Sequence, residues 1–415
     1  MNTGASPAAF ACRSCGATLH HTFVDLGTSP PCEDFLTADR LAEPESAYPL
    51  HVFTCSDCLL VQLPAHLDAR DVFDDYAYFS SFSDSWVEHA RRFTVGAVER
   101  LDLGPDSLVV EVASNDGYLL QHVLTAGVRA LGVEAADNVA QTARDRGVPT
   151  LTCYLDASAG AAIAAEHGAA DLVVANNVLA HVPDLNSFVA GLRALVQIDG
   201  WVSVEFPHLL RLVEGRQYDT IYHEHFSYFT LRTAQDALAR GGLTVIDVEE
   251  LSTHGGSLRV WARPSACAGA PGVNVLKVLA DEAGAGLHSL QGHDGFESAV
   301  FEVKQGLLRF LLDARRDGRS VAGYGAPGKG NTLLNHCGVR ADLLPYTVDR
   351  NPYKHGRFLP GSRIPVLSTE ELALRRPDYV LLLPWNLRDE LMDQLAYVAE
   401  WGGQLVVPIP HLEVL

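Results

Sequence analysis

Hydrophobic residues in the middle of the chain form short, continuous runs that alternate with longer segments of mixed polarity. Continuous β-branched runs are typical of strands that are buried on both faces of a parallel sheet. The alternation therefore predicts an α/β domain built from βαβ units. The expected strands are Leu108 to Ala113, Ala130 to Glu134, Val148 to Cys153, Asp171 to Ala175 and Trp201 to Phe206, and the expected helices include Ser83 to Arg100, Leu185 to Val196 and Leu231 to Arg240.

Two further strands, Leu243 to Leu251 and Ser257 to Ala262, follow one another without an intervening helix. Antiparallel strands can be joined by a short turn, whereas parallel strands need a long crossover. We therefore expect an antiparallel pair at one edge of this sheet.

The last third of the chain predicts a helical connector and then a second α/β unit. From about Ala270 to Arg319 the pattern is helical. One apolar face of this segment is expected to carry Leu307, Leu308, Phe310, Leu311 and Leu312. The second unit is expected to contain strands near Val321, at Tyr346 to Asp349, at Tyr379 to Leu383 and at Gln404 to Pro408, and a helix at Asn331 to His336. Together with the amino-terminal cysteines described next, we expect domains at residues 1–67, 68–265 and 266–415.

Four cysteines form two CxxC pairs, Cys12 with Cys15 and Cys55 with Cys58. Two thiolates separated by two residues can close onto one tetrahedral Zn²⁺ from a tight turn. Four sulfur ligands leave no open coordination position, so the expected zinc is structural and stabilises the N-terminal fold.

Composition excludes several classes of function. The chain has 415 residues, enough for two or three domains of roughly 150 residues each. No apolar run reaches the roughly 20 residues of a membrane-spanning helix, and the first residues lack the apolar core of a secretion signal. The formal charge of −20 argues against a nucleic-acid or anionic-membrane binder. We expect a cytoplasmic protein that is a monomer or a weak oligomer.

The turn after the first expected strand is typical of a nucleotide-binding unit. The strand runs into Ser114, Asn115 and Gly117, and the second strand ends on Glu134, which can accept two ribose hydroxyls. The glycine pattern is sparse, with Ala113 and Asn115 in place of glycine. The missing glycines count against a dinucleotide, whose pyrophosphate needs close backbone approach, and are compatible with a cofactor that has no phosphate there.

The stretch Tyr222-His223-Glu224-His225 places two imidazoles, a carboxylate and a phenol in four residues. Such a stretch can hold a general base, its orienting group and an oxyanion donor. A surface turn without chemistry and a metal site at His223 and His225 are the alternatives.

An aromatic segment with Tyr76 and Tyr78 is expected either to form a wall of a pocket or to pack between domains.

The glycine-rich turn around Gly325 to Gly330 opens the helix of the second α/β unit. Amides at a helix start, together with Lys329, can hold a diphosphate. The turn is not a Walker A loop, because Gly330 stands where Ser or Thr is needed. The alternative is a degenerate Rossmann domain without a ligand.

Three groups of residues resemble those of a class I S-adenosylmethionine (SAM) methyltransferase. They are Glu111-x-Ala113-Ser114-Asn115-x-Gly117, the acid Glu134, and Asn176-Asn177-Val178-x-x-His181. With the zinc site, the stretch Tyr222 to Phe226 and the stretch Thr253 to Arg259, the whole chain resembles the sugar C-methyltransferases of deoxysugar antibiotic pathways. The resemblance implies SAM as cofactor and a dTDP-linked 3-amino-4-keto-deoxysugar as acceptor, methylated at C-3′ in a tetronitrose-type pathway.

Within this reading, His225 is the expected base, with Glu224 as its orienting group, Tyr222 as donor to the enolate oxygen and His181 as a second candidate base. O- or N-methylation of a nucleotide sugar and non-enzymatic binding of SAM or a nucleotide sugar are the alternatives. The residues expected to contact the cofactor are Glu111, Ala113, Ser114, Asn115, Gly117, Glu134, Asn176 and Asn177, and those expected to contact the sugar nucleotide are Tyr76, Tyr78, Gly325, Lys329, Asn331, Arg350 and Lys354.

Overall fold

The computed structural model describes residues 10–67 and 79–415, which divide into two compact units. The first unit contains the chain up to His20, then Cys55–Leu209 and Phe226–Gly292. The second contains His21–Thr54, Leu210–His225 and His293–Leu415. Tyr76 and Tyr78 lie outside the described residues. The domain bounds 1–67, 68–265 and 266–415 stay a prediction.

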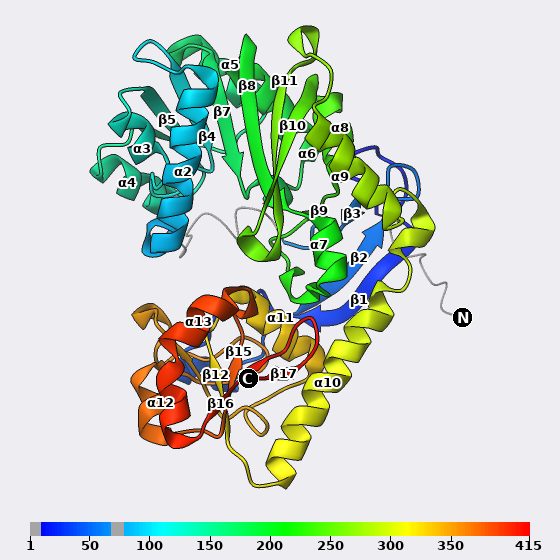
Figure 1. Cartoon of the computed structure of the whole chain (residues 1–415), viewed down its shortest axis with the longest axis vertical. Coiled ribbons are helices and arrows are strands. Elements are labelled where there is room, and N and C mark those ends of the chain that lie inside the picture. Colours follow the sequence, from blue (N-terminus) through cyan, green and yellow to red (C-terminus); the bar gives the residue numbers. More distant parts are fainter. Residues whose placement is uncertain (1–9, 68–78) are drawn as a thin grey trace. The chain divides into compact units, whose positions relative to one another are not determined.

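The first unit is built on a mixed sheet that, within the described residues, has seven strands in the order β10-β11-β8-β7-β4-β5-β6 (Figure 1). Strands β4 to β8 are parallel, whereas β11 pairs antiparallel with both β8 and β10. The predicted antiparallel edge pair is therefore confirmed. The strands are β4 Leu108–Val112, β5 Arg129–Glu134, β6 Thr150–Thr152, β7 Ala170–Asn176, β8 Val196–Pro207, β10 Leu243–Leu251 and β11 Ser257–Pro264.

The order of this sheet creates a topological switch point. From β4 the chain builds outward through β5 and β6, then returns to the other side of β4 with β7 and β8. Ligands of open α/β sheets bind outside the carboxyl ends of the strands at such a point. The loops after β4, β5 and β7 are therefore placed to form a binding site.

The helices of this unit follow local sequence signals. Helix α2 (Asp84–Leu101) starts where the side chain of Ser83 accepts from Trp86 N–H at 3.3 Å, and it buries Ala90, Phe93 and Ala97 at helical spacing. Helix α8 begins with a capping box of Thr230 and Thr233. The other helices are α3 Leu120–Thr125, α4 Asp137–Asp145, α5 Ala157–His167, α6 Leu185–Leu195, α8 Leu231–Arg240 and α9 Val273–Gly284.

A small pair of strands, β3 (Val61–Gln62) and β9 (Ser227–Tyr228), also belongs to the first unit and is antiparallel. Arg13 contacts β3 and the neighbouring loops. It donates its backbone N–H to Gln62 at 2.9 Å and its guanidinium to the carbonyls of Leu63 and Pro183 at 2.5 and 3.1 Å. These contacts attach the first CxxC turn to β3 and to the loop between β7 and the following helix.

The second unit contains its own sheet, with the order β14-β13-β12-β15-β16-β17 among the residues that are described. The first five strands are parallel, and β17 is antiparallel to β16. This is the order of a Rossmann sheet, with the switch point between β12 and β15. The strands are β12 Val321–Tyr324, β13 Thr347–Asp349, β14 Val366–Ser368, β15 Tyr379–Leu382, β16 Gln404–Val407 and β17 Glu413–Val414.

An antiparallel pair, β1 (His21–Ser29) and β2 (Tyr48–Thr54), completes the strands of the second unit. Helix α7 (Leu209–Glu214) and the short turn η4 (Tyr218–Thr220) lead to the stretch that ends at His225. The remaining helices are α10 Phe296–Arg316, α11 Gly328–Cys337, α12 Glu370–Arg375 and α13 Arg388–Gln394.

Two predictions about this unit were wrong in detail. Helix α11 begins at Gly328 rather than Asn331, because the glycine-rich turn ends at Pro327. The apolar face of α10 does not contain all five predicted residues, since Leu312 is 55% exposed. Five residues within six positions cannot share one face at 3.6 residues per turn. The buried face is Phe296, Val300, Val303, Leu307, Leu311 and Ala314.

None of the described helices combines the length and the apolar character that crossing a membrane would require.

Candidate cofactor, metal and catalytic sites

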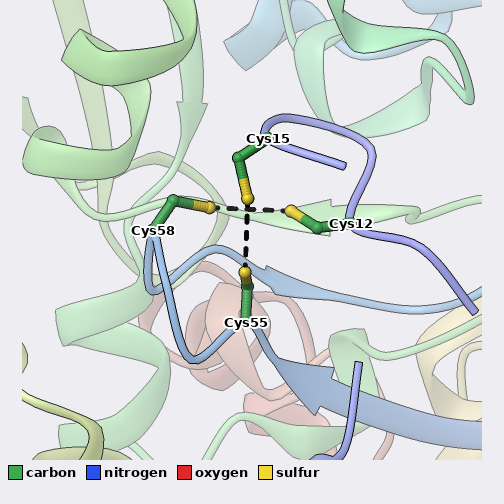
Figure 2. A group of neighbouring side chains, drawn as sticks. All are labelled: Cys12, Cys15, Cys55 and Cys58. Atoms are coloured by element: carbon green, nitrogen blue, oxygen red, sulfur yellow. Dashed lines mark hydrogen bonds between the residues drawn. The ribbon is translucent and has the colours of Figure 1, made fainter. Parts of the chain in front are cut away.

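The four cysteines of the two CxxC pairs converge on one point, as Figure 2 shows. Their sulfur atoms all lie within 4.8 Å of one another, with Cys12 and Cys58 3.6 Å apart and Cys15 and Cys55 3.5 Å apart. Tetrahedral coordination at about 2.3 Å per Zn–S bond requires sulfur separations of about 3.8 Å. The donor set therefore fits a structural Zn²⁺.

The first cofactor loop follows β4 and has a backbone that ordinary residues rarely adopt. Ala113, Asn115 and Gly117 all have positive φ, at 55°, 49° and 78°. Ala113 and Asn115 thus take the left-handed conformation that related loops usually give to glycine. Such strain persists where function requires the loop shape.

Two carboxyl groups, those of Glu134 and Glu111, lie next to this loop. Glu134, at the end of β5, accepts from the backbone N–H of Asn115 at 2.8 Å and of Ala136 at 3.0 Å, and keeps further lone pairs for ribose hydroxyls. Burial raises the pKa of Glu134. Glu111 is 1% exposed, and burial, helped by the charges of Glu134 and Asp116, raises its pKa well above the ordinary value.

The second cofactor loop follows β7 at the switch point. Asn176 ends the strand, and Asn177 has a φ of 53° while its N–H donates to Glu205 O at 2.7 Å. Among the described residues, both side-chain polar atoms of Asn177 and the hydroxyl of Ser114 have no hydrogen-bond partner. These unsatisfied groups fit a polar cofactor. His181 ends the short turn η3 (Leu179–His181) just beyond this loop.

Sequence reasoning missed the residues that fasten the first loop to the segment before α2. Ser80 N–H donates to the side chain of Asn115 at 2.8 Å. Asp116, which is fully buried, accepts from the hydroxyl of Ser81 and from Arg146 at 2.8 Å. Asp116 is adjacent to the recognised motif, but its partners are about 30 residues away in either direction. Local sequence patterns carry no signal for such contacts.

The stretch Tyr222-His223-Glu224-His225 lies in the second unit and is mostly buried. His225 Nδ1 lies 2.7 Å from Thr220 O, so Nδ1 carries the proton in the neutral ring and Nε2 keeps its lone pair. The rings of Tyr222 and His225 lie 4.0 Å apart. His223 Nε2 contacts Tyr48 O at 3.2 Å. The assigned roles of these residues stay predictions.

Glu224 is the carboxylate of this stretch, and its side chain is 3.6 Å from the thiol of Cys32. Burial, together with the negative charge of Glu33, raises the pKa of Glu224 to about 7, although the contact with Cys32 acts in the opposite direction. A carboxyl group with this pKa can exchange a proton near neutral pH. His225 Nδ1 donates to the backbone oxygen of Thr220, and the orienting role expected of Glu224 stays a prediction.

The glycine-rich turn before α11 is held by protein groups. Gly325 has a φ of 86° and donates to Val348 O at 2.7 Å. Lys329 is partly buried, donates to Asn386 and lies 4.8 Å from the ring centre of Trp385. Burial lowers the pKa of Lys329, while the nearby Asp219 carboxylate raises it.

Two of the three other residues predicted to contact the sugar nucleotide border this turn. The side chain of Asn331 donates to Cys32 O at 2.6 Å, and Lys354 Nζ donates to Ala326 O at 2.8 Å. Arg350 is exposed. One turn therefore gathers Gly325, Lys329, Asn331 and Lys354. The two ammonium groups, the Gly325 N–H and the side-chain NH₂ of Asn331 already donate to groups within the protein. Whether they contact a substrate stays a prediction.

Comparison with known proteins assigns the class. Family models match residues 12–73 (a zinc binding domain), 86–248 (Methyltransferase domain) and 252–410 (C-methyltransferase C-terminal domain). The chain is also 37% identical to C-methyltransferase NovU of Streptomyces niveus over 404 residues, which cover 97% of this chain and 96% of that protein.

Solved structures give a weaker likeness. Magnesium protoporphyrin IX methyltransferase from Synechocystis with bound SAH is 18% identical, with a TM-score of 0.34 over 43% of this chain and 81% of that chain. The PH0226 protein from Pyrococcus horikoshii is 13% identical, with a TM-score of 0.37 over 47% and 97%.

The switch-point loops, the strand order and the four-cysteine cluster define a SAM-dependent methyltransferase with a zinc-binding domain. Within that class, the match over nearly its whole length places the chain in the C-methyltransferase family that includes NovU.

Proposed function

We propose that the protein methylates C-3′ of a dTDP-linked 3-amino-4-keto-deoxysugar, in the biosynthesis of an antibiotic sugar of the tetronitrose type. The relation to a C-methyltransferase supports methylation of carbon. The observation that carries the mechanism is the contact of His225 Nδ1 with Thr220 O, because it directs Nε2 to the role of proton acceptor. SAM supplies an electrophilic methyl group when bound.

In this proposal His225 Nε2 removes the C-3′ proton, and the electron pair of the C–H bond moves into an enolate on the 4-keto group. Tyr222 donates to the enolate oxygen, a contribution on the order of 3 kcal/mol for a preorganised donor. The enolate carbon then forms the new C–C bond as the S–CH₃ bond breaks. Glu224 and His181 are the further groups proposed to exchange or hold protons at the sugar. Glu111, Glu134, Asn176 and Asn177 are proposed to hold the cofactor.

The experiment is incubation of the protein with SAM and a dTDP-linked 3-amino-4-keto sugar in D₂O. A new C–CH₃ group, or solvent deuterium at C-3′ when SAM is replaced by SAH, is the expected result. A product that carries O–CH₃ or N–CH₃ would favour the alternative reactions and refute carbon methylation. His225→Asn is expected to abolish proton exchange while the sugar nucleotide still binds; near-normal exchange would assign the base to another residue.

A further inference from the structure

The buried thiol of Cys32 has no role in the function proposed above, yet it contacts Glu224, the one carboxyl group of the proposed catalytic stretch. Cys32 lies in the loop between β1 and β2, is 4% exposed, and its Sγ lies 3.6 Å from Glu224 Oε1. Both residues belong to the second unit. Burial and the charge of Glu224 raise the pKa of Cys32 well above the ordinary value. The sulfur is therefore an S–H donor rather than a thiolate nucleophile.

Two hydrogen bonds and the close approach of Gly328 hold the segment that carries this thiol. The side chain of Asn331 donates to Cys32 O at 2.6 Å. The backbone N–H of Gly328 donates to the carboxylate of the neighbouring Glu33. Gly328 also leaves room for the sulfur, because a Cβ at that position would lie 2.8 Å from Cys32 Sγ. The start of α11 thus holds Cys32 and Glu33 together, on the side where they meet Glu224.

Cys32 and Glu33 act on Glu224 in opposite directions. The Glu33 carboxylate disfavours a second negative charge nearby, whereas the S–H group stabilises the ionised form of Glu224.

We propose that Cys32 is a positioning residue, which holds the Glu224 carboxylate by donating its S–H to Oε1. The proposal rests on the proposed function, in which Glu224 exchanges or holds a proton at the sugar. It assigns the thiol no covalent or redox step.

The test compares Cys32→Ala with Cys32→Ser, and uses Cys337→Ala as the matched control. Cys337 is also 4% exposed and lies in the same unit, but its thiol pairs with the hydroxyl of Tyr218 at 3.4 Å. Cys32→Ala is expected to lower kcat about tenfold with little change in KM, as expected on loss of one hydrogen bond to a charged group. It is also expected to move the acidic limb of the pH–rate profile to higher pH, because the ionised form of Glu224 loses a donor. Cys32→Ser is expected to restore both, and Cys337→Ala to change neither.

An unchanged pH–rate profile in Cys32→Ala, or a serine variant that behaves like the alanine variant, would overturn the proposal. The contact has a second readout that needs no turnover, namely the infrared S–H stretching band of Cys32. That band is expected to shift to higher frequency in Glu224→Gln, since a neutral amide is a weaker acceptor than a carboxylate. An unshifted band would refute the contact whatever the substrate. A shifted band in a protein that gives no C-methylated product would refute the proposed function and leave the contact in place.

Discussion

Replacing Arg259 by methionine tests what holds the carboxyl end of β8. Glu205, on β8, is fully buried and accepts from Arg259 Nη2 at 2.7 Å, from His89 Nε2 at 3.1 Å and from Thr253 Oγ1 at 3.2 Å. Burial alone would raise the pKa of Glu205, but the contact with His89 and the charge of Arg259 outweigh it and hold the pKa below its ordinary value.

Arg259→Met leaves a buried carboxylate without its cation. Removing one partner of a buried ion pair costs about 3–5 kcal/mol, because the remaining charge is still desolvated. We expect the free energy of unfolding of the variant to be lower than that of the wild type by this amount at neutral pH. In the wild type the lowered pKa means that Glu205 contributes stability above about pH 4.3, which is lost as the pH falls through the folded-state pKa. In the Arg259→Met variant the pKa of Glu205 is expected to rise above about 4.3. The loss of unfolding free energy relative to the wild type is then expected to become smaller at lower pH, where Glu205 is protonated.

The assay is urea unfolding followed by tryptophan fluorescence at several pH values. The double variant Glu205→Met with Arg259→Met removes both charges and is expected to recover more than half of the loss. Arg263→Met is the control, since Arg263 lies on the same strand, donates to the carbonyl of Asp199 at 2.7 Å, lies 5.0 Å from the ring centre of Trp201 and forms no ion pair within the described residues. A loss below about 1 kcal/mol in Arg259→Met, or a double variant in which the two single losses simply add, would refute the reasoning.

The other expected outcomes concern the metal, the cofactor and the proposed base. Metal analysis is expected to give about one zinc per chain, and Cys55→Ser to lose the metal together with stability of the N-terminal turns; a variant that keeps both would contradict the four-cysteine site. Glu134→Gln is expected to weaken SAM binding about tenfold in calorimetry, because hydrogen bonds to a charged group contribute roughly 1.5–3 kcal/mol; unchanged affinity would assign the ribose to another residue. Turnover is expected to fall below pH 7, because Glu224, with a pKa of about 7, becomes protonated there. Glu224→Gln is expected to flatten this limb, and an unchanged limb would assign it to another group.

The secondary structure of the first unit was largely predictable, because its signals are local. The bounds of α8 and β10 are those predicted, since a capping threonine and a pair of glycines mark the ends of the helix and β-branched alternation marks the strand. The buried face of α10 was not predictable, because a run rich in apolar residues does not by itself show which of them point toward the core.

The candidate sites were predictable as motifs but not as contacts. The two CxxC pairs were sufficient to predict the metal cluster, since their spacing defines the ligand geometry. By contrast, Glu224 meets Cys32 across 192 positions of sequence. No periodicity links residues so far apart, and the assignment of the stretch 210–225 to the second unit follows from three-dimensional contacts alone.

Two buried glutamates show how the surroundings separate structural from chemical carboxyl groups. Glu205 is 0% exposed, but three donors, one of them a guanidinium, keep it ionised and unable to take a proton near neutral pH. Glu224 is 9% exposed, and burial together with the charge of Glu33 raises its pKa to about 7, because the thiol of Cys32 is only a weak donor and compensates little. A buried carboxyl group whose charge is only partly compensated lowers stability, and such groups are retained where proton exchange is needed. This difference favours Glu224 as part of the proposed chemistry and Glu205 as a structural group that holds the carboxyl end of β8. It also predicts the effect of placing a guanidinium beside Glu224. A folded Cys32→Arg variant is expected to have no turnover.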